Sequence, residues 1–442
     1  MKVLFVVKSL GHFSYVSSII KELDKSCKVE LLFNKKWSQW SKEYFVLDFI
    51  QKSNNVTLDS WAVERKNKRW IFKLREIKSY INYIRQNDQS TYYLKRWGLY
   101  LPGQVRKFFS YSPVMFILSH FGIYELLTFI EKCAPASKVI KEDLIKRKPD
   151  VVVVTPINHR HSEEIEYIKA AKALNIPTVT TALSWDSLST KGVFHVIPDM
   201  TLVWNAYQAR EAIGIHDVPK DKVFITGAPF FDKWFEPQLL EERDFFCAKV
   251  GIDANRPFFV YLGSSGGIVG DETWLIQDIY NKVKKNNKLK NYQMVVRPHP
   301  ANPKYVKKLV KDDLIVYPFD GALPECVASQ RNFYNILKHC EFTVGVNTSG
   351  MLDAIINTKP CLTLMVDKYK STQAKAIHFK QLSKALKVSY SIESLIRLME
   401  LTVTEYQKNQ RFIVKEFIRP NGLDIPAGQV AAMRIKKCCR TM

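Results

Sequence analysis

Short apolar runs alternate with amphipathic segments along the first half of the chain. The apolar runs predict strands at 2–7, 28–33, 150–155, 177–183, 199–204 and 222–227. Apolar positions at helical spacing predict helices between them, for example over 163–174 and 206–213. Val-rich strands that alternate with helices are typical of a parallel sheet covered on both faces. The first half is therefore predicted to be a parallel α/β domain.

The same alternation restarts after a charged segment at 236–251. Further strands are predicted within 257–267, 292–300, 314–318, 342–350 and 360–366, with helices near 272–285, 330–339 and 351–357. A chain of 442 residues is long enough for two domains of about 200 residues each. We expect a first domain at 1–238 and a second at 239–442, whose last helix could return to the first.

Residues 61–135 depart from this alternation, and we expect them to form a basic helical insertion in the first domain. The chain has 66 Lys and Arg against 43 Asp and Glu, a formal net charge of +23 that indicates an anionic partner. In the insertion, basic residues are interleaved with aromatic ones such as Trp70, Tyr83, Trp97 and Phe108. Such helices bind anionic membranes, bind nucleic acid or form ordinary packing faces. No nucleic-acid-binding motif accompanies them, so we expect a membrane surface and no nucleic acid.

The composition also bears on where the protein works. No apolar stretch has the length that a bilayer-spanning helix needs. The N-terminal run "MKVLFVVKSL" continues into a helical pattern and lacks the features of a secretory signal. The eight cysteines include no CxxC pair, so we expect reduced thiols and no structural zinc. The expected location is the cytoplasm, with peripheral association at the inner face of the membrane.

Polar groups gather where three predicted strands of the second half end. In open parallel sheets, ligands bind beyond the carboxyl ends of the strands. Glycines let backbone N–H groups approach a phosphate, and hydroxyls before a helix add further donors. Taken singly, the Gly/Ser segment after the first strand is consistent with a plain turn. The histidine after the second strand is consistent with an ordinary loop residue, and the hydroxyls after the third with a helix cap. Together they favour a nucleotide phosphate site. The candidate residues are Gly263, Ser264, Ser265 and Gly266 after the first strand, Arg297 and His299 after the second, and Asn347, Thr348, Ser349, Gly350 and Asp353 after the third.

Several segments resemble a known group of enzymes. "RPHP" at a strand end, followed further on by "NTSGMLDAIINTKP", resembles the donor half of bacterial surface-polysaccharide transferases. These include CDP-glycerol glycerophosphotransferase-like, Kdo-transferase-like and polysialyltransferase-like enzymes. In the first half, "SWDSLSTKG" and "VFITGAPFFDKWF" are similar to segments of capsule and O-antigen transferases. The resemblance covers residues 1–35 and 145–380.

The resemblance implies a GT-B glycosyltransferase, an α/β protein in which two Rossmann-like parallel-sheet domains face a cleft. Such an enzyme moves a sugar from a nucleotide-activated donor to a lipid-linked or growing surface polysaccharide, and we expect no metal and no other cofactor. It implies that Arg297 and His299 bind the donor phosphates and neutralise charge on the leaving nucleotide. His299 could also protonate that nucleotide. Asp353 stands in the helix where the family has an acidic residue, with a ribose hydroxyl within reach.

A transferase also needs a general base for the acceptor hydroxyl, which we expect from the first half. Asp186 is the first candidate because it follows a strand in a Ser/Thr-rich loop, although an Asx turn would explain it equally well. His12, in the first strand–helix loop, and His161, after the strand at 150–155, are the other candidates. His159 and His161 also suggest a metal, but no carboxylate or cysteine set accompanies them, so none is expected.

Three other functions remain open from the sequence. A polyol-phosphate transferase with a CDP donor would use the same fold and carry phosphate into its product. An epimerase of the UDP-N-acetylglucosamine 2-epimerase type shares the two-domain design but needs no acceptor, which would leave the insertion unexplained. A non-catalytic protein would bind nucleotide or glycan without turnover. The sugar, the anomeric outcome and the oligomeric state are not predicted.

Overall fold

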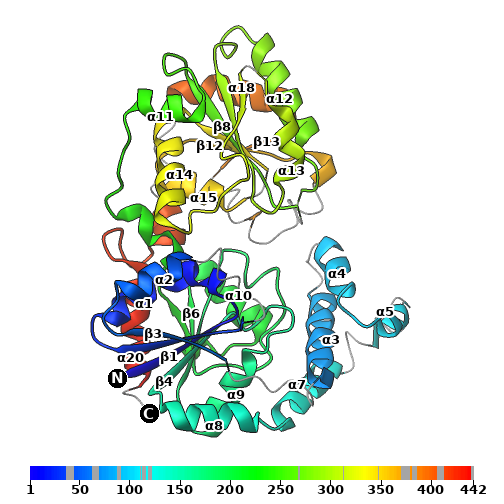
Figure 1. Ribbon diagram of the computed structural model, residues 1–442. Helices are drawn as coiled ribbons and strands as arrows, with labels where there is room; N and C mark the ends of the chain where they lie inside the picture. Colours follow the sequence, from blue (N-terminus) through cyan, green and yellow to red (C-terminus); the bar gives the residue numbers. More distant parts are fainter. Residues whose placement is uncertain are drawn as a thin grey trace. The chain divides into compact units, whose positions relative to one another are not determined.

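A computed structural model describes most of the chain. The described residues are 1–35, 44–61, 69–86, 91–109, 111, 116–117, 122–266, 269–311, 313–346, 348–369, 379–380, 386–405 and 413–439. The chain forms two compact units: Met1–Lys233 together with Lys415–Met442, and Trp234–Val414. Each unit contains its own parallel sheet (Figure 1).

The first unit is built on a sheet whose strands are all parallel, in the order β3-β2-β1-β4-β5-β6-β7. The strands are β1 (Lys2–Val7), β2 (Lys28–Phe33), β3 (Val56–Ser60), β4 (Val151–Thr155), β5 (Thr178–Thr181), β6 (Met200–Val203) and β7 (Val223–Ile225). The helices are α1 (Phe13–Asp24), α2 (Tyr44–Gln51), α8 (Lys138–Arg147), α9 (Ile165–Ala173), α10 (Ala206–His216) and α20 (Ala427–Cys438), with 3₁₀ turns η1 (Leu10–His12), η4 (Lys220–Lys222) and η5 (Pro229–Phe235).

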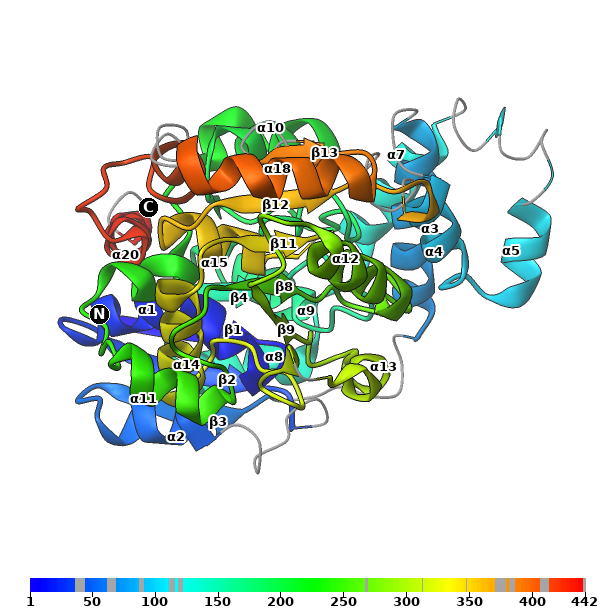
Figure 2. The ribbon, with the colours of Figure 1, turned by 90° about the horizontal axis from the view of Figure 1, so that it is seen from above.

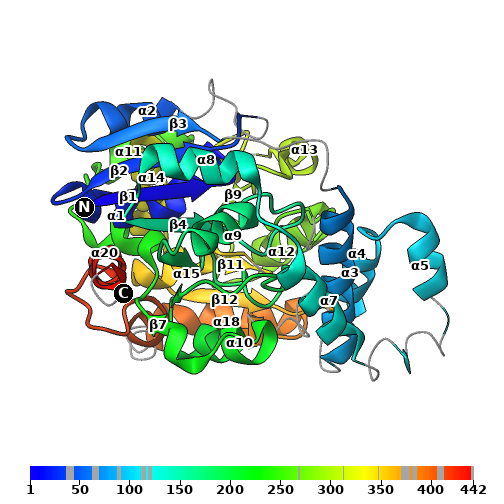
Figure 3. The ribbon, with the colours of Figure 1, turned by 90° about the horizontal axis from the view of Figure 1, so that it is seen from below.

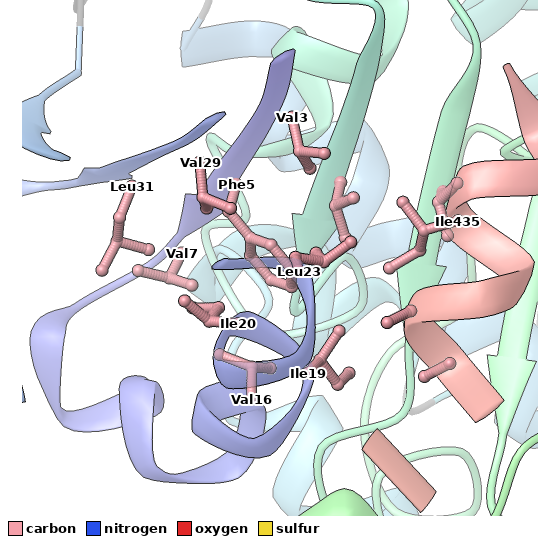
Figure 4. Packing of buried hydrophobic residues seen from close by; sticks show 14 of the residues in the cluster. Val3, Phe5, Val7, Val16, Ile19, Ile20, Leu23, Val29, Leu31 and Ile435 are labelled. Atoms are coloured by element: carbon pink, nitrogen blue, oxygen red, sulfur yellow. The ribbon is translucent and has the colours of Figure 1, made fainter. Parts of the chain in front are cut away.

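Helices cover both faces of this sheet because its central strands are apolar on both sides. Val3 and Phe5 of β1 pack with α1 and α20, whereas Leu4 and Val6 pack with α8 and α9. Figure 4 shows the first of these clusters, in which Ile435 of α20 lies beside residues of β1 and α1. The last helix of the chain is thus part of the core of the first unit.

A buried carboxylate, Asp232, holds the C-terminal helix α20 in the first unit. Asp232 is 4% exposed and accepts hydrogen bonds from the backbone N–H groups of Ala427 and Gly428 at the start of α20. It also accepts from Ser18 Oγ of α1 at 2.6 Å and pairs with Arg419 at 2.8 Å. Asp232 therefore satisfies the N-terminal donors of α20 and ties that helix to α1.

The insertion lies between β3 and β4, and its described part consists of helices and short connecting segments. Its helices are α3 (Arg69–Arg85), α4 (Thr91–Gly98), α5 (Gly103–Phe109) and α7 (Ile123–Cys133), which gather beside the sheet of the first unit (Figure 3). Arg75 of α3 forms a two-pronged ion pair with Glu131 of α7 and a further one with Glu166 of α9. All three side chains are buried. This network attaches the insertion to the parallel α/β fold.

The second unit repeats the design, with parallel strands in the order β10-β9-β8-β11-β12-β13. The strands are β8 (Phe258–Leu262), β9 (Gln293–Arg297), β10 (Leu314–Val316), β11 (Thr343–Gly345), β12 (Cys361–Leu364) and β13 (Lys387–Ser389). The helices are α11 (Arg243–Val250), α12 (Thr273–Lys285), α13 (Pro303–Val306), α14 (Val327–His339), α15 (Gly350–Ile356) and α18 (Ile392–Glu405), with 3₁₀ turns η6 (Lys307–Leu309) and η7 (Asp367–Tyr369). The π-helix η8 (Val414–Ile418) begins at the last residue of this unit and continues into the first. α12 and α18 pack on one face of the sheet, and α14 lies on the other (Figure 2).

The predicted fold class is confirmed: two Rossmann-like parallel-sheet domains, the first with a helical insertion. Two strands escaped the sequence analysis, β3 and β13, and both stand at sheet edges. No helix in the described ranges combines the length and the apolarity that a bilayer span requires.

Candidate functional site

Both sheets reverse their strand order at one position, and the polar segments predicted from the sequence cluster there. In the second unit the reversal falls between β8 and β11, and β9 lies on the other side of β8. Gly263–Gly266 follows β8, Arg297–His299 ends β9, and Thr348–Gly350 follows β11. The structure therefore brings the three predicted segments together at the carboxyl edge, where open α/β sheets bind ligands. Asn347 lies outside the described residues.

Gly263 allows the loops after β8 and β9 to touch. Its N–H donates to Arg297 O at 2.9 Å. A Cβ atom at this position would lie 3.0 Å from His299 N and 3.1 Å from Arg297 O, which is too close for an unstrained contact. A glycine is therefore needed for the two strand tips to lie this close together.

The sequence analysis missed a buried carboxyl group beneath this loop. Glu272 is 4% exposed and accepts hydrogen bonds from Ser264 N–H at 2.7 Å and from Tyr261 Oη at 2.6 Å. Burial raises the pKa of Glu272 to about 7, although both hydrogen bonds oppose this shift. Glu272 therefore holds the Gly/Ser loop at the end of β8. Two adjacent acidic residues, Asp271 and Glu272, directly precede the following helix and are visible in the sequence. The sequence does not indicate that Glu272 bonds to Ser264 and Tyr261.

His299 carries a specific tautomer. Its Nδ1 accepts a hydrogen bond from Ala301 N–H at 3.1 Å, so the ring proton of the neutral imidazole is on Nε2. No hydrogen-bond partner of Nε2 occurs among the described residues. Burial lowers the pKa of His299, which keeps the ring neutral at pH 7. In this state His299 can donate one hydrogen bond to an anion from Nε2.

Arg297 is turned into the protein. Its guanidinium donates to Ala322 O at 2.6 Å and to Asn332 Oδ1 at 3.3 Å, and it stacks 4.2 Å from the ring centroid of Phe333. Burial lowers the pKa of Arg297 to about 10, so it remains charged at pH 7. It thus ties β9 to α14 and places a fixed positive charge beneath the strand tip. Its direct contact with a phosphate stays a prediction.

In the third segment, which follows β11, hydroxyl groups lie at the surface, whereas the carboxylate of Asp353 is buried. Ser349 is exposed and makes no side-chain capping bond, and Thr348 Oγ1 accepts weakly from Gly350 N–H at 3.4 Å. Asp353 is 2% exposed and accepts a hydrogen bond from Trp234 Nε1 at 2.6 Å. Asp353 thus fixes α15 from inside the unit, and its contact with a ribose stays a prediction.

In the first unit, two imidazoles lie at the corresponding reversal between β1 and β4. The ring centroids of His12 and His159 are 5.7 Å apart, and Ser9 Oγ lies 2.8 Å from His12 Nδ1. Burial, assisted by Lys8, lowers the pKa of His12 to about 4. Burial, assisted by Lys191, lowers that of His159 well below its usual value. Both rings are neutral at pH 7 and so have an unprotonated nitrogen, while the lowered pKa makes each a weaker base than a free imidazole.

Asp186 stands near these imidazoles, but its carboxylate already has local partners. It accepts from Ser184 Oγ at 2.5 Å and from Thr190 Oγ1 at 2.9 Å, and Lys191 Nζ lies 3.4 Å away. Its own carbonyl accepts from Thr190 N–H. These contacts are typical of a loop-organising aspartate. The role of Asp186 as general base stays a prediction.

His161 lies on the same loop as His159 and points differently. Its backbone has φ of 52°, its side chain is 48% exposed, and its Nδ1 lies 3.8 Å from Glu76 Oε1. The imidazole that packs against His12 is therefore His159, which the sequence analysis considered only as a metal ligand. In the sequence, both histidines follow the strand β4 closely, so their position alone could not show which of them lies beside His12. The described residues contain no group of three or more metal-ligating side chains.

The insertion supports the loop that carries Asp186. Tyr83 Oη of α3 donates to Lys191 O at 3.0 Å, and Trp97 Nε1 of α4 donates to Thr190 O at 3.3 Å. A Cβ atom on Gly192 would lie 2.8 Å from Ser79 Oγ and 3.0 Å from the Trp97 ring. Some aromatic residues of the insertion therefore serve internal packing, whereas Trp70 and Phe108 remain about half exposed, at 48% and 58%.

No protein-family model matches the chain, and no curated protein matches it in sequence. Solved structures match its fold over nearly the full length. A UDP-GlcNAc 2-epimerase from Methanocaldococcus jannaschii superposes with a TM-score of 0.57 at 13% identity, covering 99% of this chain and 100% of the other. Its complex with UDP-GlcNAc and UDP gives 0.55 at 15% identity, with the same coverage. A glycosyltransferase from Rickettsia africae ESF-5 gives 0.56 at 9% identity, covering 100% and 99%. The chain therefore has the GT-B type of fold that these enzymes share.

Proposed function

We propose that this protein is an enzyme that acts on a sugar activated by uridine diphosphate. The observation that carries the proposal is the strand-tip arrangement of the second unit. There, the Gly263–Gly266 loop and the Nε2–H group of His299 lie at the reversal of strand order, above the fixed charge of Arg297. The N–H groups of Gly263 and Ser264 are bonded inside the unit, so the donors offered to a diphosphate are the rest of the loop, the exposed Ser349 hydroxyl and the neutral imidazole. The likeness to a structure in complex with UDP-GlcNAc and UDP supports uridine as the nucleoside.

The first candidate reaction is epimerisation at C2 of the sugar. It is supported by full-length likeness to UDP-GlcNAc 2-epimerases. Inverting a carbon centre that bears hydrogen requires a group that removes a proton and a group that returns one. His12 and His159 are neutral imidazoles at the strand tips of the first unit, and either can accept a proton. Asp186 is the carboxylate beside them.

The second candidate is glycosyl transfer to a lipid-linked or growing polysaccharide, as in capsule or O-antigen synthesis. It is supported by the surface of the insertion, which a reaction on a small sugar nucleotide does not require. On α5, Arg106 and Lys107 are exposed beside Phe108. Exposed aromatic and basic side chains together bind anionic bilayers. In this case the protein would act as a peripheral enzyme at the inner face of the membrane.

One experiment separates the two reactions. Purified protein is incubated with UDP-GlcNAc in D₂O and followed by proton NMR. Epimerisation exchanges the C2 hydrogen with solvent and yields the C2 epimer without an acceptor. Transfer leaves C2 protonated and needs an added glycan or lipid-linked acceptor. If neither exchange nor acceptor-dependent release of UDP occurs, the enzyme proposal is wrong.

The membrane surface is tested separately by sedimentation with vesicles of phosphatidylglycerol or phosphatidylcholine. We expect binding to the anionic vesicles alone, and a loss of several-fold in Phe108→Ser. Phe245→Ser is the matched control because Phe245 is 66% exposed in the second unit. Equal binding of both variants, or none by the wild type, would contradict the peripheral membrane proposal.

A further inference from the structure

The first unit contains a large cavity that plays no part in the strand-tip clusters. It has a volume of about 670 Å³ and lies between the insertion helices α3 and α7 and the helices α8, α9 and α10 of the parallel α/β fold. Figure 3 shows α3 and α7 alongside that layer of the unit. Small-molecule sites in proteins have volumes of roughly 300–1,000 Å³. The cavity is thus large enough for an organic ligand.

A buried lysine that bonds to no carboxylate lines this cavity, with Asp217 and Glu131 near enough to raise its pKa against the effect of burial. Lys78 of α3 is 3% exposed and makes no hydrogen bond or ion pair within the described part of the chain. Its Nζ lies over the ring of Tyr124, 4.6 Å from the centroid. Burial lowers its pKa to about 8, so at pH 7 it is still mostly charged. A buried and unpaired ammonium group is costly unless an anion accompanies it.

Neither carboxylate of the cavity wall forms an ion pair with Lys78, and together they do not balance the lysines of the wall. Glu131 is bonded to Arg75 and Lys169, and Asp217 accepts a hydrogen bond from Tyr124 Oη at 2.8 Å. Two further lysines of the wall form no ion pair with a described residue; they are Lys132 and Lys141. The cavity therefore has an excess of positive charge.

Much of the remaining wall is apolar, although Thr128, His195 and His216 also line it. Phe194, Val196 and Ile197 line one part, and Pro135 and Ala136 line another. Phe194 is buried, and its neighbours on this loop are partly buried. A free inorganic anion would satisfy the lysines but leave these side chains against water. A ligand with an apolar body would satisfy both kinds of surface.

We propose that this cavity is a binding site for an anionic amphiphile, a molecule with a phosphate or carboxylate head and a compact apolar body. Lys78, Lys132 and Lys141 bind the head, and Phe194, Val196 and Ile197 contact the body. The site is separate from both strand tips, so it does not depend on the proposed function. Because its walls join the insertion to the α/β fold, a bound ligand stabilises the insertion in place.

The test measures binding of octyl phosphate to the full-length protein by isothermal titration calorimetry, below the micelle concentration. We expect inorganic phosphate and the neutral octyl glucoside each to bind at least about tenfold more weakly, because each lacks half of the recognised groups. We expect Lys78→Met to weaken octyl phosphate binding by about tenfold or more without loss of folding, since it removes a buried, unpaired charge at similar volume. Affinity for UDP should not change.

Lys73→Met is the matched control, because Lys73 is exposed on the same helix. It should bind octyl phosphate like the wild type. If Lys78→Met does not fold, Val196→Trp replaces it, since a large side chain there obstructs the apolar part of the cavity and should block binding of the octyl chain. The proposal is overturned if the wild type does not bind octyl phosphate. It is also overturned if inorganic phosphate binds equally well or if both replacements in the wall bind like the wild type.

Discussion

The two units share one arrangement of strands but differ in what stands at the reversal of strand order. In the second unit, the tip is made of backbone groups and hydroxyls around Gly263, with one neutral imidazole, His299. In the first unit, the tip holds two neutral imidazoles, His12 and His159, near Lys8 and Lys191. The tip of the second unit therefore suits binding of an anion, and the tip of the first unit suits transfer of a proton.

The two tips are also held in place by different means. In the second unit, neighbouring loops touch through their backbones, and Glu272 fastens the loop from beneath. In the first unit, side chains of the insertion hold the loop, through Tyr83 and Trp97. The comparison teaches that a repeated topology fixes where a site can form, while the loops and an insertion decide its chemistry.

The largest expected effect comes from the first unit. His12→Ala should lower turnover of the UDP sugar by about 10²–10⁴-fold, the usual contribution of a general acid or base. Its affinity for UDP should remain within about twofold of the wild type, since nucleotide binding is assigned to the second unit. Steady-state kinetics and calorimetry provide the two measurements. Normal turnover in this variant would remove the imidazole pair from the mechanism.

Arg75→Met tests whether the insertion is part of the first unit's stability. It leaves Glu131 and Glu166 buried with part of their counter-charge removed, which costs about 3–5 kcal/mol of unfolding free energy. Urea denaturation measures this loss, and Lys73→Met, on an exposed site of the same helix, should stay within about 0.5 kcal/mol. A loss below about 1 kcal/mol would show that the network is not needed to hold the insertion.

Gly263→Ala tests the backbone contact in the second unit. The added Cβ must push His299 N and Arg297 O away, so the two strand tips separate and the affinity for UDP should fall by about tenfold, or about 1.4 kcal/mol. Gly270→Ala is the matched control, since a Cβ there has no neighbour within 4 Å. Calorimetric titration with UDP compares them. Equal affinities would show that the close approach is not required.

Glu272→Gln should have the smallest effect and depends on pH. The carboxyl group has a pKa of about 7 in the folded protein and 4.5 as its ordinary value, so the native state retains a proton that the unfolded state releases between these values. Stability therefore falls as pH rises from about 4.5 to 7. The variant should reduce this fall by about 1 kcal/mol between pH 5 and pH 6, measured by urea denaturation at both values. An unchanged pH dependence would show that Glu272 is ionised throughout.

Much of the fold could be predicted because buried parallel strands are continuous apolar runs. The strands at 2–7 and 28–33 have the predicted bounds. The missed edge strands lack this signature. In β3, buried and exposed positions alternate and include Thr57 and Asp59, and β13 has three residues, Lys387–Ser389. The other two edge strands, β7 and β10, were predicted because they retain an apolar run, so polar content and shortness, and not edge position alone, hid β3 and β13.

The location of the candidate site could be predicted, but the direction of its side chains could not. Polar residues after a strand are visible in the sequence, and the parallel topology gathers them. Whether a side chain faces a ligand depends on partners distant in sequence. Asp353 turns inward to Trp234, and Arg297 turns to Ala322 and Asn332. The role of Glu272 depends likewise on the fold around it.

The measurement that tests the central claim most directly is the affinity of the wild type, His299→Ala and His12→Ala for UDP, by isothermal titration calorimetry at one pH and salt concentration. The strand-tip assignment predicts that the wild type and His12→Ala bind equally. It predicts that His299→Ala binds about 10–100-fold more weakly, the cost of one hydrogen bond to a charged group. Failure of the wild type to bind UDP at millimolar concentration, or wild-type affinity in His299→Ala, would contradict it.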